Sequence, residues 1–279
     1  MNIGLVLSGG GVRGIAHIGA IKALEEHGIY PTHIAGTSAG AIVGALYANG
    51  VAWKAMLDFF KELELFSLAK YARNKPGLMD STKFYDELKQ YLPDDSFESL
   101  KKSLYITATN LLDGTLKVFH KGELIWPLLA SSAVPGMFTP VKINNHYYID
   151  GGTLNNFPVD LIKMFCNRII GVYVSPLGKE KIENLNHSYS IVERAYQIKT
   201  AYESQSKFKD CDVFIHPKNM NDYNLFSMKN ADAIFDLGYE AALEALKNSD
   251  IAEKASDLAA EFEAMNGFSV ELEKIDHKA

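Results

Sequence analysis

The pentapeptide Gly36-Thr37-Ser38-Ala39-Gly40 constrains the fold of this chain more than any other stretch. It has the form Gly-x-Ser-x-Gly, and it lies between a short apolar or β-branched run at 32–35 and a helical pattern at 41–48. A strand, a sharp turn and a helix in this order form a nucleophile elbow, in which glycines leave room around a serine held in a strained backbone conformation. The pattern therefore predicts an α/β fold that presents the Ser38 hydroxyl at a strand end, next to the positive end of a helix dipole.

The same five residues also have an ordinary interpretation. Gly-x-Ser-x-Gly occurs by chance, and it is then a plain turn between a strand and a helix. The strand and helix on either side favour the catalytic interpretation without deciding between the two. The decision depends on the other residues that would surround Ser38.

A glycine-rich loop, Ser8-Gly9-Gly10-Gly11-Val12-Arg13-Gly14, joins an expected strand at 3–7 to an expected helix at 15–27. Gly9, Gly11 and Gly14 match the G-x-G-x-x-G pattern of a Rossmann dinucleotide site. That site needs an acidic residue about 20 residues beyond the loop, and the Gly-x-Ser-x-Gly stretch stands there instead. The alternative is an oxyanion hole, because residues without side chains let backbone N–H groups converge on a developing negative charge.

Composition and charge exclude several classes of protein. The 279 residues are 47% hydrophobic, which suffices for one large α/β domain and excludes disorder. The 28 basic and 34 acidic residues give a net charge of −6, so we expect no nucleic-acid partner.

The first residues lack a basic segment, and no apolar run is long enough to cross a bilayer. We therefore expect neither a signal peptide nor a spanning helix, and a cytoplasmic location. Cys166 and Cys211 indicate neither a disulfide framework nor a zinc site, and we expect buried, reduced thiols in strand-like surroundings.

The rest of the chain predicts strands and helices in alternation. We expect strands at 104–109, 117–119, 147–149, 168–174 and 213–215, and helices at 51–71, 81–92, 123–132, 188–209 and 231–247. An Asp-Gly turn at 113–114 indicates that the first two of these strands form a hairpin. The segment 51–71 is either a core helix or a lid or lipid-facing surface, because its apolar residues extend beyond a simple amphipathic face. The last thirty or so residues are acidic and alanine-rich and predict peripheral helices.

A serine hydroxyl needs a base to accept its proton, and two residues compete for that role. His216 follows an expected strand, and Ser38, Asp150 and His216 have the chain order of an α/β-hydrolase triad. The topology argues against such a triad. In an α/β-hydrolase several strands precede the elbow strand, whereas here only one does. Asp150 also ends an expected strand, and Gly151 and Gly152 after it would let a substrate or another backbone approach closely. An aspartate base would have to be buried, since its usual pKa of about 3.9 is low for this role.

Three blocks in order, at 9–14, 36–40 and 150–152, resemble the signature blocks of the patatin-like phospholipase family. The stretch at 130–140 resembles a fourth block, which precedes the Asp-Gly-Gly sequence. Together the blocks span residues 4 to about 175, and the part beyond about 185 matches no motif of the family. The family often has Asp where Ser8 stands, and this change leaves a hole built from backbone N–H groups intact.

The resemblance implies a Ser-Asp dyad without a histidine. Ser38 would attack an ester carbonyl, and Asp150 would take its proton, return it to the leaving alkoxide and then activate a water molecule. The loop residues Gly9, Gly10, Gly11, Val12 and Arg13 would hold the oxyanion and nearby substrate atoms, with Arg13 either bracing the loop or meeting a phosphate head group. Gly36, Gly40, Gly151 and Gly152 would support this geometry. No metal or cofactor is implied, because the nucleophile, the base and the oxyanion donors are all protein groups.

The resemblance also implies the fold and the function. We expect a three-layer α/β/α domain with a mainly parallel central sheet and the elbow after its second strand. Residues 1–185 would form the catalytic region, and 186–279 a helix-rich C-terminal part of the same domain. The expected activity is hydrolysis of lipid acyl esters, of phospholipase A or lysophospholipase type, with peripheral membrane contact through apolar surface such as 51–71. Two alternatives remain: a thioesterase or acyltransferase with the same dyad, and a non-catalytic lipid- or nucleotide-binding regulator.

Overall fold

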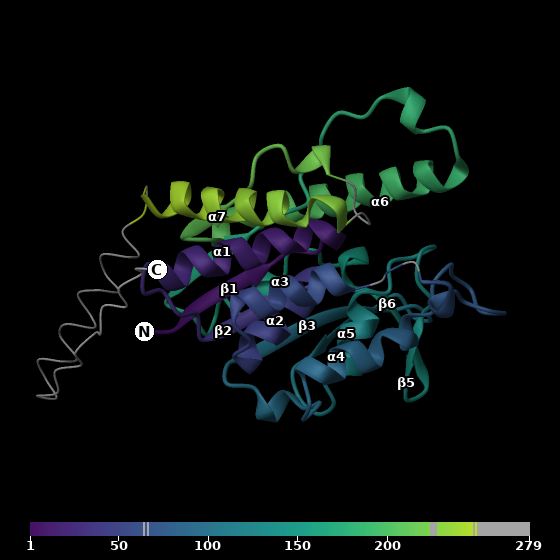
Figure 1. Ribbon diagram of the computed structural model, residues 1–279, viewed down its shortest axis with the longest axis horizontal. Coiled ribbons are helices and arrows are strands. Elements are labelled where there is room, and N and C mark those ends of the chain that lie inside the picture. The colour runs from purple at the N-terminus through teal and green to yellow at the C-terminus, as the bar shows by residue number, and fades with distance from the viewer. Residues whose placement is uncertain (64, 66, 224–227, 248, 250–279) are drawn as a thin grey trace, which may run out of the picture.

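A central sheet organises the computed structural model, which describes residues 1–63, 65, 67–223, 228–247 and 249 (Figure 1). Eight strands within these residues form the sheet in the order β5-β6-β3-β2-β1-β7-β8, and β4 pairs with β3 off this path. The strands β3, β2, β1, β7 and β8 are parallel neighbours, whereas β4, β5 and β6 pair in antiparallel fashion. The bounds are β1 Ile3–Leu7, β2 His33–Gly36, β3 Ser103–Asn110, β4 Leu116–Phe119, β5 Val141–Ile143, β6 His146–Asp150, β7 Arg168–Val172 and β8 Val213–Ile215. The mainly parallel sheet predicted from the sequence is therefore confirmed, with an antiparallel edge.

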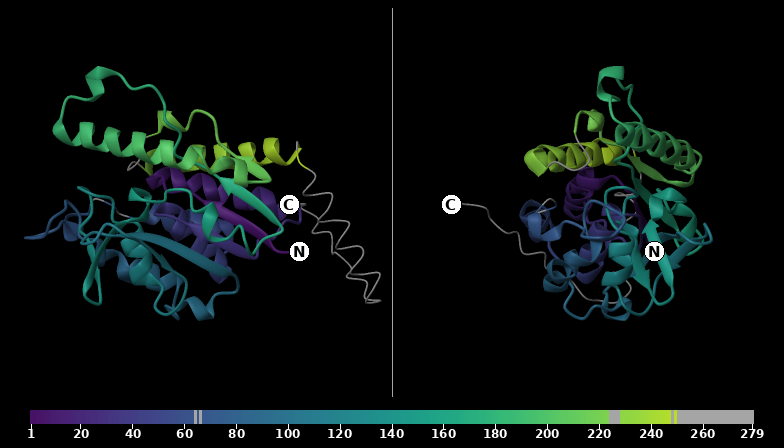
Figure 2. Two further views of the ribbon diagram at one scale, coloured as in Figure 1. Left: turned by 180° about the vertical axis from the view of Figure 1, so that it is seen from behind. Right: turned by 90° about the vertical axis from the view of Figure 1, so that its right-hand side faces the viewer.

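Helices flank this sheet, as the views from behind and from the side show (Figure 2). Their bounds are α1 Ile15–Glu26, α2 Ala39–Asn49, α3 Trp53–Glu62, α4 Tyr85–Tyr91, α5 Ile125–Ser131, α6 Ser188–Gln205 and α7 Ala231–Lys247. Leu5 and Leu7 of β1 face the larger apolar core, which includes side chains of α1, α2 and α7. Val6 points to the opposite face and packs in a second core around Phe157. Both faces of β1 are buried, which explains its uninterrupted apolar sequence.

The predicted elements are confirmed with shifts of a few residues at their ends, and the hairpin of β3 and β4 forms as expected. One prediction is wrong, and one strand was missed. The helix expected over 51–71 ends at Glu62, where Leu63 adopts an extended backbone, and only a short 3-10 turn at Leu68–Lys70 follows within the described residues. Strand β5 was not predicted, because a three-residue edge strand is too short to show a period. The helices expected in the last thirty residues lie outside the described residues.

The two cysteines lie just before strands β7 and β8 and not within them. Cys166 and Cys211 are free thiols, partly buried against the second core, so the predicted burial is only partial. Burial raises the pKa of the Cys166 thiol, and it raises the pKa of the Cys211 thiol to about 12. Both thiols are consequently protonated and weakly nucleophilic at neutral pH.

Helix α7 lies against α1 because glycines allow their backbones to touch (Figure 1). A Cβ atom on Gly238 would overlap the carbonyl oxygen of Ala16. A Cβ on Gly19 would lie 2.7 Å from the backbone nitrogen of Tyr239. The crossing of the two helices therefore tolerates no side chain at either glycine.

We expect Gly238→Ala to lower the free energy of unfolding by about 2 to 4 kcal/mol, because its Cβ would meet backbone atoms that cannot move aside. Helix propensity alone would act in the opposite direction, by about 1 kcal/mol in favour of alanine. Denaturant titration followed by circular dichroism measures the change. The exposed Glu240 on the same helix provides a control, since Glu240→Ala should stay within about 0.5 kcal/mol. A Gly238→Ala protein as stable as the unaltered chain would contradict the close contact.

Candidate active site

Ser38 occupies a strained turn between β2 and α2. Its backbone has φ 54° and ψ −125°, in a region that side-chain-bearing residues rarely adopt. The flanking glycines are required by space: a Cβ on Gly36 would lie 2.6 Å from the carbonyl oxygen of Gly40, and one on Gly40 would lie 2.6 Å from that of Ser8. The backbone N–H of Ser38 donates to Oγ of Ser131 over 2.8 Å, which fixes the turn from the side of α5.

Asp150 is the last residue of β6, and the sheet brings it next to the elbow. β6 pairs with β3, and β3 pairs with β2, whose end leads into Ser38. Asp150 is 2% exposed, and Ser38 is 5% exposed. The backbone N–H of Gly152 donates to Oδ1 of Asp150 over 2.7 Å. A Cβ on Gly151 would lie 2.5 Å from the carbonyl oxygen of Thr107, so this glycine lets the chain turn tightly against β3.

Burial raises the pKa of the Asp150 carboxyl to about 6, well above its ordinary value. Hydrogen bonds from Ser38, Gly152 and Tyr196 act in the opposite direction, because they stabilise the carboxylate. At neutral pH the group is mostly ionised, yet it binds a proton more tightly than an ordinary aspartate does. The structure thus places a carboxylate of increased basicity beside the Ser38 hydroxyl.

The glycine loop runs along the other side of Ser38. The N–H of Gly9 donates to the carbonyl oxygen of Asn156 over 3.1 Å, and the Ser175 hydroxyl donates to the carbonyl oxygen of Gly9 over 2.7 Å. A Cβ on Gly9 would lie 3.3 Å from Cβ of Ser38, so the loop and the serine are in contact. Across the described residues, the backbone N–H groups of Gly10, Gly11 and Val12 have no hydrogen-bond partner. Unpaired N–H groups beside a serine are a suitable site for a negatively charged oxygen.

An apolar cavity opens on one side of Ser38. It holds about 760 Å³ of empty space, counting the part open to solvent. Its wall includes Ile42, Phe59, Phe60, Phe84, Leu88 and Leu128, which come from α2, α3, α4, α5 and the turn before α4. The cavity is therefore suited to a hydrocarbon chain that reaches Ser38.

A second, more polar cavity opens on the other side of Ser38, and Asp150 and the glycine loop line it. Arg13 also lines it, is 8% exposed, and donates from Nε to the carbonyl oxygen of Tyr223 over 2.9 Å. Burial lowers the pKa of the Arg13 guanidinium, and the nearby charge of Glu193 raises it. Ser38 thus lies in the wall that the apolar and the polar cavity share.

No histidine among the described residues lines either cavity. His216 follows β8, and its Nδ1 is 3.2 Å from the carbonyl oxygen of Tyr173; it lines neither cavity. His17 is fully buried on α1, where its Nε2 is 2.8 Å from the carbonyl oxygen of Ser8 and burial lowers its pKa to about 4. It is therefore uncharged at neutral pH and supports the glycine loop from behind. Within the described part of the chain, no three His, Cys, Asp or Glu side chains are grouped so as to hold a metal ion.

Comparison with known proteins identifies the family. The sequence profile described as patatin-like phospholipase matches residues 5–162, more than half of the chain. The chain belongs to the patatin-like phospholipase family. The matched segment contains the glycine loop, Ser38 and Asp150, whereas α6 and α7 lie beyond it.

Individual relatives carry related descriptions. An uncharacterized NTE family protein of Mycobacterium tuberculosis is 32% identical over 162 residues, which cover 56% of this chain and 44% of that protein. Lysophospholipase nte1 of Aspergillus fumigatus is 33% identical over 168 residues, which cover 58% of this chain and 11% of that protein. The patatin-like chain thus spans less than half the length of either relative. The crystal structure of VipD from Legionella pneumophila is similar in fold, with a TM-score of 0.58 and 15% identity over 88% of this chain and 67% of that chain.

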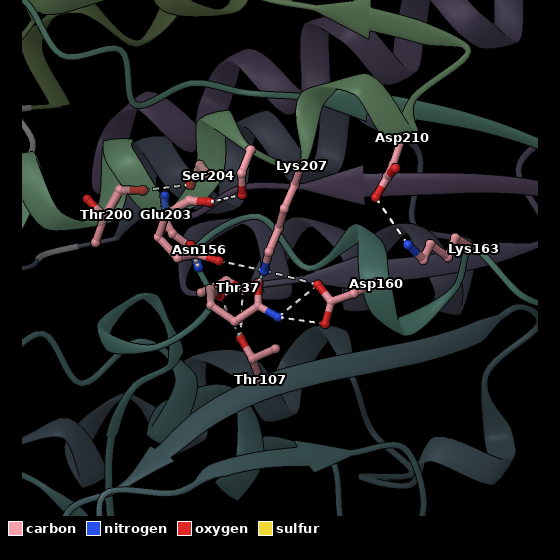
Figure 3. A network of polar contacts seen from close by, with 12 residues as sticks. Thr37, Thr107, Asn156, Asp160, Lys163, Thr200, Glu203, Ser204, Lys207 and Asp210 are labelled. Carbon is pink, nitrogen blue, oxygen red and sulfur yellow. Dashed lines mark hydrogen bonds and ion pairs between the residues drawn. The ribbon is translucent and has the colours of Figure 1, made fainter.

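The sequence analysis missed the polar groups that connect α6 to this patatin-like site. Figure 3 shows them as a network between α6 and the loop after β6. Glu203 accepts a hydrogen bond from the N–H of Asn156 over 3.1 Å, and Lys207 bonds Oδ1 of Asn155 over 2.8 Å. The Thr37 hydroxyl of the elbow donates to the carbonyl oxygen of Asn155 over 2.9 Å. The network therefore holds the elbow and the loop after Asp150 in one arrangement.

Lys207 is the cation at the centre of this network. Its ammonium lies 2.5 Å from Oε1 of Glu203 and 3.1 Å from Oδ1 of Asp160. It is one-fifth exposed, so solvent replaces these contacts incompletely. Its only signal in the sequence is that Thr200, Glu203 and Lys207 fall on one face of the helical segment, which many exposed helices also show.

We expect Lys207→Met to lower the free energy of unfolding by about 1 to 3 kcal/mol, because Glu203 and Asp160 would keep their charges without a cation between them. Thermal or denaturant unfolding measures this loss. The matched control is Lys209→Met, since Lys209 is exposed near the end of the same segment and should change stability by less than about 0.5 kcal/mol. Equal stability of the two variants would show that the network contributes nothing.

Proposed function

We propose that this patatin-like protein hydrolyses acyl esters of lipids, with Ser38 as nucleophile and Asp150 as base. The observation that carries the proposal is the position of Ser38, a serine with φ 54° in the wall shared by an apolar and a polar cavity and beside a buried carboxyl. An acyl ester has an apolar chain on one side of its carbonyl and a polar alcohol on the other. The two cavities match these two halves.

The first half of the proposed reaction transfers the acyl group to the enzyme. Oγ of Ser38 attacks the ester carbonyl while its proton passes to Asp150, and the carbonyl oxygen becomes an oxyanion that the N–H groups of Gly10, Gly11 and Val12 stabilise. The tetrahedral intermediate then collapses, and Asp150 gives the proton to the leaving alkoxide. An acyl ester of Ser38 and a free alcohol result.

The second half releases the acid. Asp150 takes a proton from a water molecule, whose oxygen attacks the acyl carbonyl, and the same N–H groups again hold the oxyanion. Collapse expels the Ser38 oxygen, which recovers its proton from Asp150. A free acid leaves the apolar cavity, and the dyad is restored.

The apolar cavity also refines the two interpretations of the segment at 51–71. Phe59 and Phe60 of α3 are buried and line the cavity, as Leu63 does, so this part of the segment is a wall for the acyl chain. Leu68 is 87% exposed, and Tyr71 and Leu78 are also exposed. We propose these three side chains as the peripheral contact with a lipid surface.

No helix among the described residues is both long and apolar enough to cross a bilayer. The cytoplasmic location and the boundary at 185 stay predictions.

We expect Ser38→Ala and Asp150→Asn each to lower kcat for ester hydrolysis about a thousandfold or more, because one removes the nucleophile and the other the base. Release of fatty acid from a panel of acyl esters and phospholipids measures the effect. His216→Ala is the control and should keep its activity, since His216 lines neither cavity. Ester cleavage that Ser38→Ala leaves unchanged, or no cleavage of any ester by the unaltered protein, would refute the proposal.

We expect Ile42→Trp to lower kcat/KM for esters of long acyl chains about tenfold or more, because Ile42 lies one helical turn beyond Ser38 in the wall of the apolar cavity. A butyrate ester serves as the internal control, because its acyl chain is too short to reach the part of the cavity that the tryptophan would fill. This ester should react within a few-fold of the unaltered rate. Rates over a series of 4-nitrophenyl esters from butyrate to palmitate measure the preference. An unchanged chain-length profile would place the acyl chain elsewhere.

A further inference from the structure

One face of α6 lies on the catalytic loops, although α6 falls outside the segment that matches the family. Tyr196, Thr200 and Glu203 follow the spacing i, i+4 and i+7, which places them on one side of α6, and Lys207 lies just beyond its end. Glu203 and Lys207 hold the loop at 155–160, as described above. Tyr196, two turns earlier on the same face, lines the polar cavity together with Ser38 and Asp150.

The Tyr196 hydroxyl reaches the carboxyl of Asp150. It donates to Oδ1 of Asp150 over 3.5 Å, and the N–H of Gly152 donates to the same oxygen over 2.7 Å. The distance from the hydroxyl is long for a hydrogen bond, but such contacts in catalytic sites commonly shorten when substrate binds. Two donors on Oδ1 leave the second carboxylate oxygen for the proton of Ser38.

The contact between Tyr196 and Asp150 explains why residue 152 is a glycine. A Cβ on Gly152 would lie 2.7 Å from the hydroxyl oxygen of Tyr196 and 3.0 Å from Oδ1 of Asp150. Any side chain there would therefore separate the tyrosine from the carboxylate. The second glycine of the Asp-Gly-Gly block makes room for a residue that lies far along the chain and outside the matched segment.

We propose that Tyr196 is a positioning residue for the base: its hydroxyl holds Oδ1 of Asp150 so that the other carboxylate oxygen faces Ser38. This inference rests on the proposed function for its effect on the reaction, but the contact itself exists without substrate. It gives α6 a part in the catalytic site, because this helix carries Tyr196 and its Glu203 accepts a hydrogen bond from the N–H of Asn156, while Lys207 just beyond the helix bonds Asn155.

The Tyr196 hydroxyl also affects the pKa of Asp150. A donor stabilises the carboxylate, so Tyr196 lowers the Asp150 pKa against the opposing effect of burial. Burial and the charge of Asp150 raise the pKa of Tyr196 well above its ordinary value, which keeps the tyrosine protonated as a donor. Among the described residues, the other charged groups that line this cavity are Arg13 on the glycine loop and Glu193 on α6. Lys199 on α6 lies outside the lining and bonds the carbonyl oxygen of Thr153.

The test is Tyr196→Phe, which removes the hydroxyl and keeps the ring. With a soluble ester such as 4-nitrophenyl butyrate, we expect kcat to fall about 3- to 10-fold with little change in KM, as for the loss of one hydrogen bond. Loss of the donor raises the pKa of Asp150, so the acidic limb of the kcat profile should move to higher pH. Tyr202→Phe is the matched control on the same helix, because Tyr202 is 71% exposed; its kcat and pH profile should match those of the unaltered protein.

A second readout does not depend on catalysis. The ¹³C resonance of the Asp150 carboxyl, assigned by its loss in Asp150→Asn, gives the pKa of that group directly in the full chain. We expect the midpoint to move upward in Tyr196→Phe and to stay in place in Tyr202→Phe. An unmoved midpoint in folded Tyr196→Phe would overturn the inference, whether or not the unaltered protein cleaves esters. A moved midpoint in a protein without esterase activity would support the contact and refute the proposed function alone.

Discussion

The close packing of the elbow against the end of β1 is the constraint on which the site depends. A Cβ on Gly40 would lie 2.6 Å from the carbonyl oxygen of Ser8, so the first turn of α2 touches the start of the glycine loop. This contact keeps Ser38 and the N–H groups of Gly10 and Gly11 together without any side chain between them. The backbone strain at Ser38 persists because β1, β2 and α2 are all packed in the large apolar core.

The burial of Asp150 has a cost in stability. Its pKa of about 6 exceeds the ordinary value of 3.8, so the folded state disfavours the carboxylate by about 3 kcal/mol at neutral pH. Because the pKa is raised on folding, the favourable contribution of the protonated group is complete below about pH 4 and is lost as the pH rises through 6. Within the described residues the hydrogen bonds to this carboxylate come from Ser38, Gly152 and Tyr196, none of which carries a positive charge. The rest of the fold must offset the cost of burying this group.

The C-terminal part of the described chain contributes to the same structure. β8 extends the sheet beside β7, α7 covers α1, and α6 lies on the loop after Asp150. The family resemblance ends before all three. In this protein they complete the sheet, the apolar core and the surroundings of Asp150.

Most helices and strands, and the tight turn at Ser38, could be predicted from the sequence because their signals are local. Gly36, Ser38 and Gly40 predict a tight turn through backbone rules alone, and the apolar runs of β1, β2 and β7 predict buried strands. The period of the apolar residues was misleading at α3, which ends at Glu62 although apolar residues continue. Leu63 has an extended backbone, and Leu63 and Leu65 line the apolar cavity. The three residues of β5 acquire their strand only from pairing with β6.

The groups that surround Ser38 could not be read from the sequence, because they come together through the tertiary fold. Ser131, Asn156 and Tyr196 reach the site from α5, the loop after β6 and α6, and nothing in their local sequence distinguishes them from other polar residues. The pKa of Asp150 likewise depends on burial by segments distant in the chain. The physical reason is that hydrogen bonds and desolvation act across space, whereas helix and strand periods and glycine turns act along the chain.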